Sequence, residues 1–228
     1  MNTETTDSPV DPAYLLDPFE LRVLAVLAEK EALTPDIYPM SLNALTNGCN
    51  QLSSRDPVMS ISETTVQEAL DRLQQRKLVA EVSQAGARVN KYEHRMRIKW
   101  TLEQDKLSVL TLLMLRGAQT GGEIRSRVGR MHEFNSVAEV ETCLQFLMDK
   151  YPPLVARMAR APGTKEARYM HLFAGAEALE RQELVAGSAS APHSGSNRIE
   201  ELEREVARLR DSVVELSQQF EQFKKQFE

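Results

Sequence analysis

Histidine and cysteine side chains are the groups in this chain that most often serve as metal ligands, bases or nucleophiles. They are His94, His132, His171, His193, Cys49 and Cys143. No two of them share a metal-site spacing, and neither cysteine has a histidine nearby in the sequence. His94 and His171 occupy matching places in two similar segments, so we interpret both as structural residues and expect no metal site.

The segment from Gly117 to Gly122 has the glycine spacing that opens a phosphate-binding P-loop. Glu123 and Ile124 follow it, where a P-loop needs Lys and then Ser or Thr to hold phosphate and Mg²⁺. We interpret the segment as a helix end followed by a turn. No GxSxG or paired-carboxylate pattern occurs either, so we expect no cofactor, no catalytic residue and a protein that is not an enzyme.

Arginine and lysine are the remaining side chains that suit a ligand, because they pair with phosphates and base edges. They gather on two predicted hairpins (Arg88, Lys91, Arg95, Arg97 and Lys99; then Arg157, Arg160, Lys165 and Arg168) and on one predicted helix (Arg125, Arg127 and Arg130). Arg55 adds a cation in a long polar loop, residues 50–61. These residues are candidates for binding DNA or a partner protein. The alternative is a solvated surface whose charges balance nearby carboxylates.

Two predicted helices, which begin after Ser62 and Ser136, would face DNA, and both are acidic on their exposed sides. Their exposed residues are Glu63, Thr64, Gln67, Glu68, Asp71 and Arg72 in the first, and Ala138, Glu139, Glu141, Thr142, Gln145 and Asp149 in the second. Carboxylates repel phosphate. Only Gln67 and Gln145 suit base recognition, so phosphate contacts from the hairpins and the arginine-bearing helix are the better candidates.

The elements that position these residues begin at Asp17, which with Glu20 forms a capping box ahead of a helix that should end near Glu31. Ser41 and Ser62 are expected to cap a second and a third helix. After residue 77 the apolar period changes from 3.6 to 2, which predicts a β-hairpin with its turn at residues 84–86. Three helices followed by a hairpin is the order of a winged-helix domain.

The same order repeats about 74 to 77 residues later. Thr101 and Gln104 predict a capping box, Gly117 a helix end, and residues 122–130 a second helix. Ser136 predicts the start of a third helix that buries Val137, Val140, Leu144 and Leu147. Residues 154–155 and 168–171 predict a second hairpin around a turn at 161–163. We therefore expect a mainly α chain of α+β class with two tandem winged-helix domains, residues 17–99 and 100–175.

The remaining segments are an expected disordered tail at residues 1–16, a linker at 176–197 and a coiled coil at 198–228. Apolar residues in the last segment alternate spacings of three and four, as in heptads. They are Ile199, Leu202, Val206, Leu209, Val213, Leu216, Phe220, Phe223 and Phe227. This pattern favours a parallel homodimer. The alternative is an amphipathic helix that docks on its own chain.

Several segments together resemble the YceH-like family of uncharacterised bacterial proteins. They are residues 34–39 (TPDIYP), 49–51 (CNQ), 55–59 (RDPVM), 116–120 (RGAQT), 125–127 (RSR), 130–131 (RM) and 168–173 (RYMHLF). The resemblance runs from about Pro18 to Gly175. It implies tandem winged-helix domains and no known activity.

Composition narrows the function classes further. The net charge of -5 and pI of about 5.6 argue against indiscriminate polybasic binding to nucleic acid. No segment resembles a signal peptide or a membrane span, and the two isolated cysteines suggest a reducing compartment, so we expect a cytoplasmic protein without membrane contact. Two functions stay open: a dimeric DNA-binding regulator, and a protein-interaction scaffold that does not bind DNA.

Overall fold

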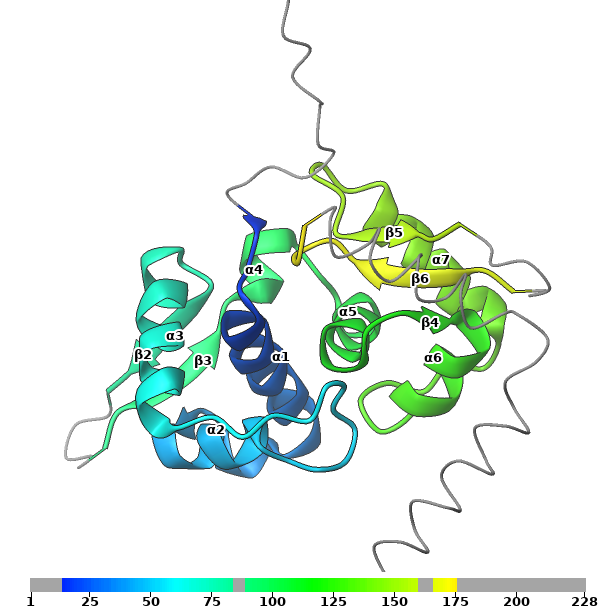
Figure 1. Ribbon diagram of the computed structural model, residues 1–228. Coiled ribbons are helices and arrows are strands. Elements are labelled where there is room, and N and C mark those ends of the chain that lie inside the picture. The colour runs from blue at the N-terminus through cyan, green and yellow to red at the C-terminus, as the bar shows by residue number, and fades with distance from the viewer. Residues whose placement is uncertain (1–13, 84–88, 160–165, 176–228) are drawn as a thin grey trace, which may run out of the picture. The chain divides into compact units, whose positions relative to one another are not determined.

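The computed structural model describes residues 14–83, 89–159 and 166–175. Within them the chain is α+β, with helices around two small antiparallel sheets (Figure 1). The predicted turns at 84–86 and 161–163, the linker and the C-terminal heptads lie outside the described residues.

The first half of the described chain runs from α1 to β3. Its elements are α1 (Pro18–Leu33), the 3-10 helix η2 (Pro35–Ile37), β1 (Met40–Ser41), α2 (Leu42–Cys49), α3 (Glu63–Gln75), β2 (Val79–Val82) and β3 (Lys91–His94). Asp17 caps α1 in a complete capping box with Glu20, and Ser41 and Ser62 cap α2 and α3, as predicted.

A short helix, α4 (Met96–Trp100), leads into the second half, which repeats the element order of the first. The elements are α5 (Gln104–Arg116), β4 (Gln119–Thr120), α6 (Gly121–Val128), α7 (Val137–Met148), β5 (Val155–Arg157) and β6 (Arg168–His171). Gly117 ends α5 with a φ of 70°, and Ser136 caps α7, as predicted.

Each half contains a three-stranded antiparallel sheet, in which the first strand precedes the second helix and the last strand lies in the middle. The strand orders are β1-β3-β2 and β4-β6-β5. His94 pairs with Val79 and His171 pairs with Val155, so the two histidines have the same register in their sheets. The two-residue strands β1 and β4 are too short to leave a periodic signal, and they were not predicted.

Three details of the second half differ from the sequence prediction. Thr101 does not cap a helix: it ends α4 in the left-handed region at φ 51°, and α5 starts after Glu103 without a side-chain cap. A capping box does form at Thr120 and Glu123, ahead of α6. Val137, expected in the core, is 37% exposed because it occupies the first turn of α7.

The central helices α1 and α5 are buried around their whole circumference rather than along one apolar face. Every residue from Val23 to Ala28 in α1 is buried, and so is every residue from Leu107 to Leu115 in α5. Helix α1 packs against α3 on one side and α5 on another, which explains the lack of a single stripe. Both halves lie within one compact unit of the chain.

The junction between the halves has further contacts around α4. The rings of Trp100 and Phe173 stack with centroids 4.9 Å apart. The Leu16 backbone N–H donates to the Phe173 carbonyl at 2.8 Å. Arg97 of α4 pairs with Glu31 of α1 at 2.9 Å and donates to Gln104 of α5. Residues near both ends of the described chain therefore meet at this junction.

Candidate binding surface

Arg55, a candidate for binding a ligand, lies inside the first half. Its guanidinium is fully buried and donates to both carboxylate oxygens of Glu29, at 3.0 and 2.6 Å. Further bonds reach the Gly48 carbonyl and the Gln51 side chain. A paired, hydrogen-bonded cation is the form in which burial of an arginine is tolerated. Arg55 is not available to a surface ligand, and we remove it from the candidate residues.

The long loop of residues 50–61 is held along most of its length. Asn50 exchanges two hydrogen bonds with the backbone of Ile61, both 2.9 Å long. Arg22 donates to the Pro57 carbonyl at 2.5 Å, and the Asp56 N–H donates to the Leu115 carbonyl in α5 at 2.8 Å. The loop therefore also contacts the second half.

The third helices of the two halves, α3 and α7, carry the predicted acidic faces. Glu68 and Asp71 are exposed on α3, and Glu139 and Glu141 are exposed on α7. The Gln67 amide donates to Asp71 at 2.8 Å and accepts from the Tyr92 hydroxyl at 3.2 Å. Gln145 donates to Asp149 at 2.7 Å in the same manner. Both candidate base readers are thus engaged within the protein.

The three arginines in and after α6 are exposed, but they differ in what they contact. Arg125 donates to the backbone carbonyls of Phe134 and Asn135 at 3.2 and 3.0 Å, and it forms no ion pair with a carboxylate of the described residues. Arg127 lies 3.5 Å from Glu123 and also donates to Gln119. Arg130 forms no hydrogen bond or ion pair with the described part of the chain. Arg125 and Arg130 therefore keep their charge available.

The hairpin cations also divide into engaged and available groups. Arg168 is tied to α6, because it donates to the Ala118 carbonyl at 2.9 Å and pairs with Glu123 at 3.2 Å. Arg157 at the end of β5 and Lys91 at the start of β3 have no such partner among the described residues. Three further hairpin candidates, Arg88, Arg160 and Lys165, lie outside the described residues. So do the dimerisation candidates Ile199, Leu202, Val206, Leu209, Val213, Leu216, Phe220 and Phe223.

Lys77 is an exposed cation that the sequence pattern did not single out. It follows α3 in the left-handed region, with a φ of 57°, where glycine or asparagine is usual. The hydrogen bond from the Leu78 N–H to the Leu73 carbonyl closes the helix around it. The sequence offered one indication of this residue: Lys77 directly follows the third helix, at a position where a glycine usually ends a helix.

Both cysteines and both hairpin histidines have surroundings that suit structural residues. Burial raises the pKa of Cys49 to about 12. Burial and a hydrogen bond to Asp105 raise that of Cys143 to about 12 as well. Thiols with such a pKa are poor nucleophiles at neutral pH. His94 Nδ1 accepts the Met96 N–H at 3.2 Å, and burial lowers the pKa of His171 to about 4.

Among the described residues no group of three or more His, Cys, Asp or Glu side chains is arranged to hold a metal ion. No helix in the described ranges is long and apolar enough to cross a membrane.

Comparison with known proteins gives a consistent set of relatives. Residues 16–164 match the family model described as "Protein of unknown function, DUF480". The chain is 61% identical to a UPF0502 protein of Herminiimonas arsenicoxydans over the full length of both. It is 62% identical to one of Janthinobacterium sp. (strain Marseille), over 100% of this chain and 97% of the relative. For Azoarcus sp. (strain BH72) the identity is 53%, over 99% and 100%.

Proposed function

This chain belongs to the DUF480 family, and we propose that it is a non-enzymatic binding protein built from two tandem winged-helix domains. The support for this fold is the order of elements: each half has three helices, a short strand between the first and second helices, and two strands after the third helix that complete a three-stranded antiparallel sheet. The raised thiol pKa values and the internal bonding of His94 support binding rather than catalysis. The unpaired cysteines fit the cytoplasmic location expected from the sequence.

The proposed ligand is duplex DNA, bound through its phosphates by the second half. The observation that carries this proposal is that Arg125, Arg130 and Arg157 have no carboxylate partner in the described chain. Guanidinium groups bind phosphate oxygens with good geometry, and phosphate contacts supply most sequence-independent affinity. The acidic faces of α3 and α7 argue that these helices contribute little base recognition.

Titration of a mixed-sequence duplex by fluorescence anisotropy, at several salt concentrations, tests the proposal. We expect measurable affinity at low salt, and a slope of log affinity against log salt that falls by roughly 0.9 for each phosphate contact removed. Changing Arg125, Arg130 and Arg157 together to Ala should therefore flatten the slope by almost three. The control Lys150→Ala removes a cation of the same half that lies over the Phe146 ring, and it should leave the slope unchanged.

A protein-interaction scaffold is the second candidate, and the internal engagement of Gln67 and Gln145 favours it. Helices that present carboxylates in place of free base readers suit a basic protein partner better than DNA. The same titration separates the two candidates. Absence of duplex binding at low salt contradicts the DNA proposal and leaves the scaffold.

Dimerisation through residues 198–228 remains part of the proposal, although those residues lie outside the described ranges. The heptad pattern is its only support. Light scattering of the full chain, and of a chain that ends at Ser196, tests it. We expect a dimer that becomes a monomer on truncation, and a full-length monomer would contradict the proposal.

A further inference from the structure

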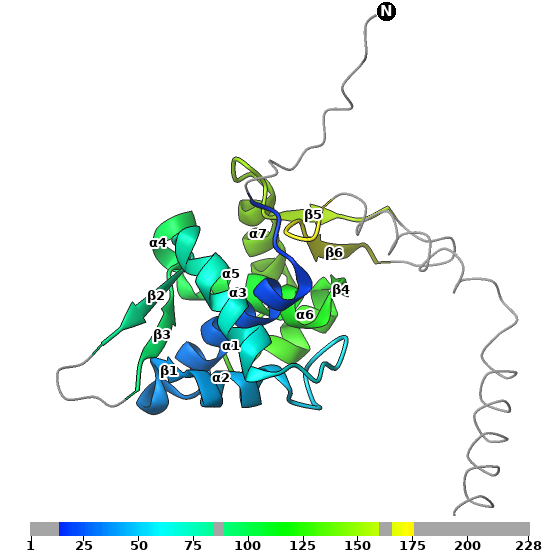
Figure 2. The same cartoon turned by 60° about the vertical axis from the view of Figure 1, so that its left-hand side comes forward.

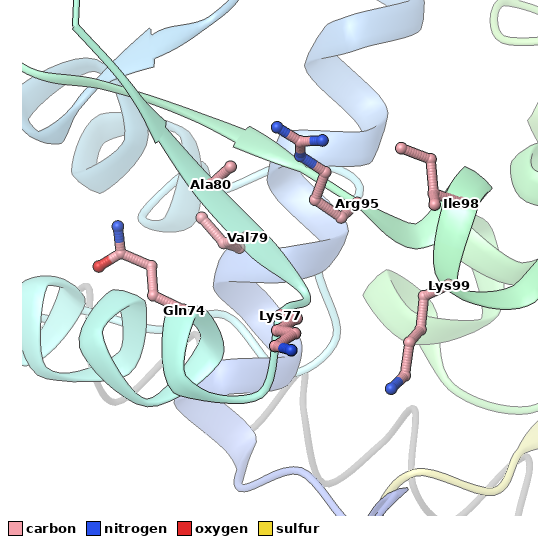
Figure 3. Close-up of a pocket in the computed structure, with 7 residues that line it drawn as sticks. All are labelled: Gln74, Lys77, Val79, Ala80, Arg95, Ile98 and Lys99. Carbon is pink, nitrogen blue, oxygen red and sulfur yellow. The ribbon is translucent and has the colours of Figure 1, made fainter.

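A pocket of about 540 Å³ lies between the end of α3, the start of β2 and the connecting helix α4 (Figure 3). Three apolar residues, Val79, Ala80 and Ile98, line it together with three cationic residues, Lys77, Arg95 and Lys99. Its volume falls within the range of small-molecule sites in proteins. None of the candidate arginines of the second half lines it, so it is separate from the proposed DNA contacts.

The charge of this pocket is largely uncompensated. No carboxylate lines it. Arg95 pairs with Glu93 at 3.0 Å. The Lys99 ammonium lies over the Tyr14 ring, 6.0 Å from its centroid, and forms no ion pair with the described residues. Lys77 forms no ion pair with the described residues. Three cations against one carboxylate leave a net charge of +2, which matches the charge of about -1.5 to -2 on a phosphate monoester at neutral pH.

The arrangement of the side chains favours an elongated ligand. In Figure 3 the ammonium groups of Lys77 and Lys99 lie toward one end of the pocket, while the Arg95 guanidinium points toward the other. The Arg95 Nε is buried and has no hydrogen-bond partner in the part of the chain that the structure describes. A buried donor without a partner is uncommon in a native fold and suggests a missing acceptor.

The apolar part of the wall distinguishes a small organic ligand from a nucleic-acid backbone. Ile98 is 73% exposed at the pocket, whereas Val79 is almost fully buried. An exposed isoleucine beside lysines gains little from a phosphodiester chain, but it gains from covering an apolar ligand body.

We propose that this pocket binds a small organic phosphate with an apolar body. Lys77 and Lys99 hold the phosphate as point charges. Ile98 covers the body, and the exposed end of the Arg95 guanidinium donates to an acceptor at the far end.

Isothermal titration calorimetry on the full chain tests the pocket with three probes: phenyl phosphate, inorganic phosphate and phenol. We expect phenyl phosphate to bind most tightly, because it alone uses both the cations and the apolar wall. Lys99→Gln should weaken phenyl phosphate by about tenfold or more, as expected for a lost charge-assisted hydrogen bond. Ile98→Ser should weaken phenyl phosphate but leave inorganic phosphate unchanged. Both side chains are exposed, so neither substitution should disturb folding.

Lys150→Gln is the matched control, because it removes a lysine just after α7, the third helix of the second half, and outside this pocket. The proposal is overturned if phenyl phosphate does not bind at low-millimolar concentrations, or if Lys150→Gln weakens it as much as Lys99→Gln. The proposal would also be overturned if the mixed-sequence duplex displaced phenyl phosphate and Lys99→Gln weakened duplex binding as much as phenyl phosphate binding. That result would assign the pocket to the DNA backbone.

Discussion

The two halves have the same element order, yet they stabilise equivalent contacts with different chemistry. At the contact between the first and third helices, the first half uses ion pairs, in which Arg72 lies 2.7 Å from Asp17 and 3.2 Å from Glu20. The second half uses an aromatic ring instead. Lys106 and Lys150 lie over Phe146, 5.4 and 4.6 Å from its centroid. The packing of the elements is therefore compatible with either chemistry.

The two sheet histidines, His94 and His171, also occupy equivalent positions with different chemistry. His94 lies 3.1 Å from Glu31, and contact with this imidazole, followed by that with Arg97, lowers the pKa of Glu31 to about 2. His171 has the same register, but it forms no ion pair with the described residues, and its ring stacks on Phe173 with centroids 5.9 Å apart. One position holds a polar pair and the other a neutral aromatic ring.

The two halves differ most in whether the arginine at the loop before the third helix is exposed to a ligand. In the first half the loop arginine, Arg55, is buried on Glu29. In the second half Arg125, in the last turn of α6, donates to two backbone carbonyls of the loop that follows and remains exposed. The first half thus neutralises the cation of this loop internally, whereas the cation that contacts the loop of the second half stays at the surface.

The largest expected effect comes from breaking the buried ion pair. Arg55→Met removes the bidentate partner of the buried Glu29 carboxylate and leaves it only the Lys30 ammonium, 3.3 Å away, among the described residues. This change should lower the free energy of unfolding by about 3 kcal/mol. Arg125→Met, its exposed counterpart, should cost about 1 kcal/mol or less. Urea denaturation measures both. The double change Glu29→Met with Arg55→Met should be more stable than Arg55→Met alone, and a less stable double variant would contradict the proposed pairing.

A pH-dependent loss of stability should follow from His171. Its pKa falls from 6.5 to about 4 in the folded protein because it is buried. Between these pH values the unfolded chain binds the proton more readily than the folded chain does. The contribution of neutral His171 to the free energy of unfolding is therefore complete above pH 6.5 and is lost as the pH falls toward 4. The loss should approach about 3 kcal/mol.

Urea denaturation at several pH values checks this, with His171→Leu as the variant that lacks the titrating group. Stability of the variant should change less between pH 6.5 and 4 than that of the parent chain. Equal pH dependence of the two chains would show that His171 titrates normally in the fold.

We expect a smaller loss of stability when either contact between the first and third helices is broken, and the two losses should respond differently to salt. Arg72→Ala removes a half-exposed ion pair and should cost about 1 kcal/mol at low salt and less at high salt, because ions screen surface charges. Phe146→Ala should cost a similar amount with little salt dependence, since much of its contribution is apolar contact. Thermal unfolding at two salt concentrations measures both. The same salt response in the two variants would remove the distinction.

The smallest effect concerns the glutamines of the third helices. Gln67→Ala leaves the hydroxyl of the buried Tyr92 without an acceptor and should cost about 1 kcal/mol. Gln145→Ala breaks only an exposed bond to Asp149 and should stay within about 0.5 kcal/mol. Urea denaturation compares them. If either variant changed the preference for one duplex sequence over another, that glutamine would be a base reader after all.

The sequence by itself determined the positions and order of the main elements. Capping residues such as Asp17, Ser62 and Ser136 and the ending glycine Gly117 act within a few residues of the chain, so local patterns were sufficient to find them. The change of apolar period located the longer strands for the same reason.

Only the tertiary structure decided which cations remain available. Arg55 pairs with a carboxylate 26 residues away, and Arg168 with one 45 residues away, so neither contact leaves a signal at local spacing. The circumferential burial of α1 and α5 depends on contacts between the halves. The available cations of the candidate surface, and the pocket beside α4, follow from side chains that meet only after the chain has folded.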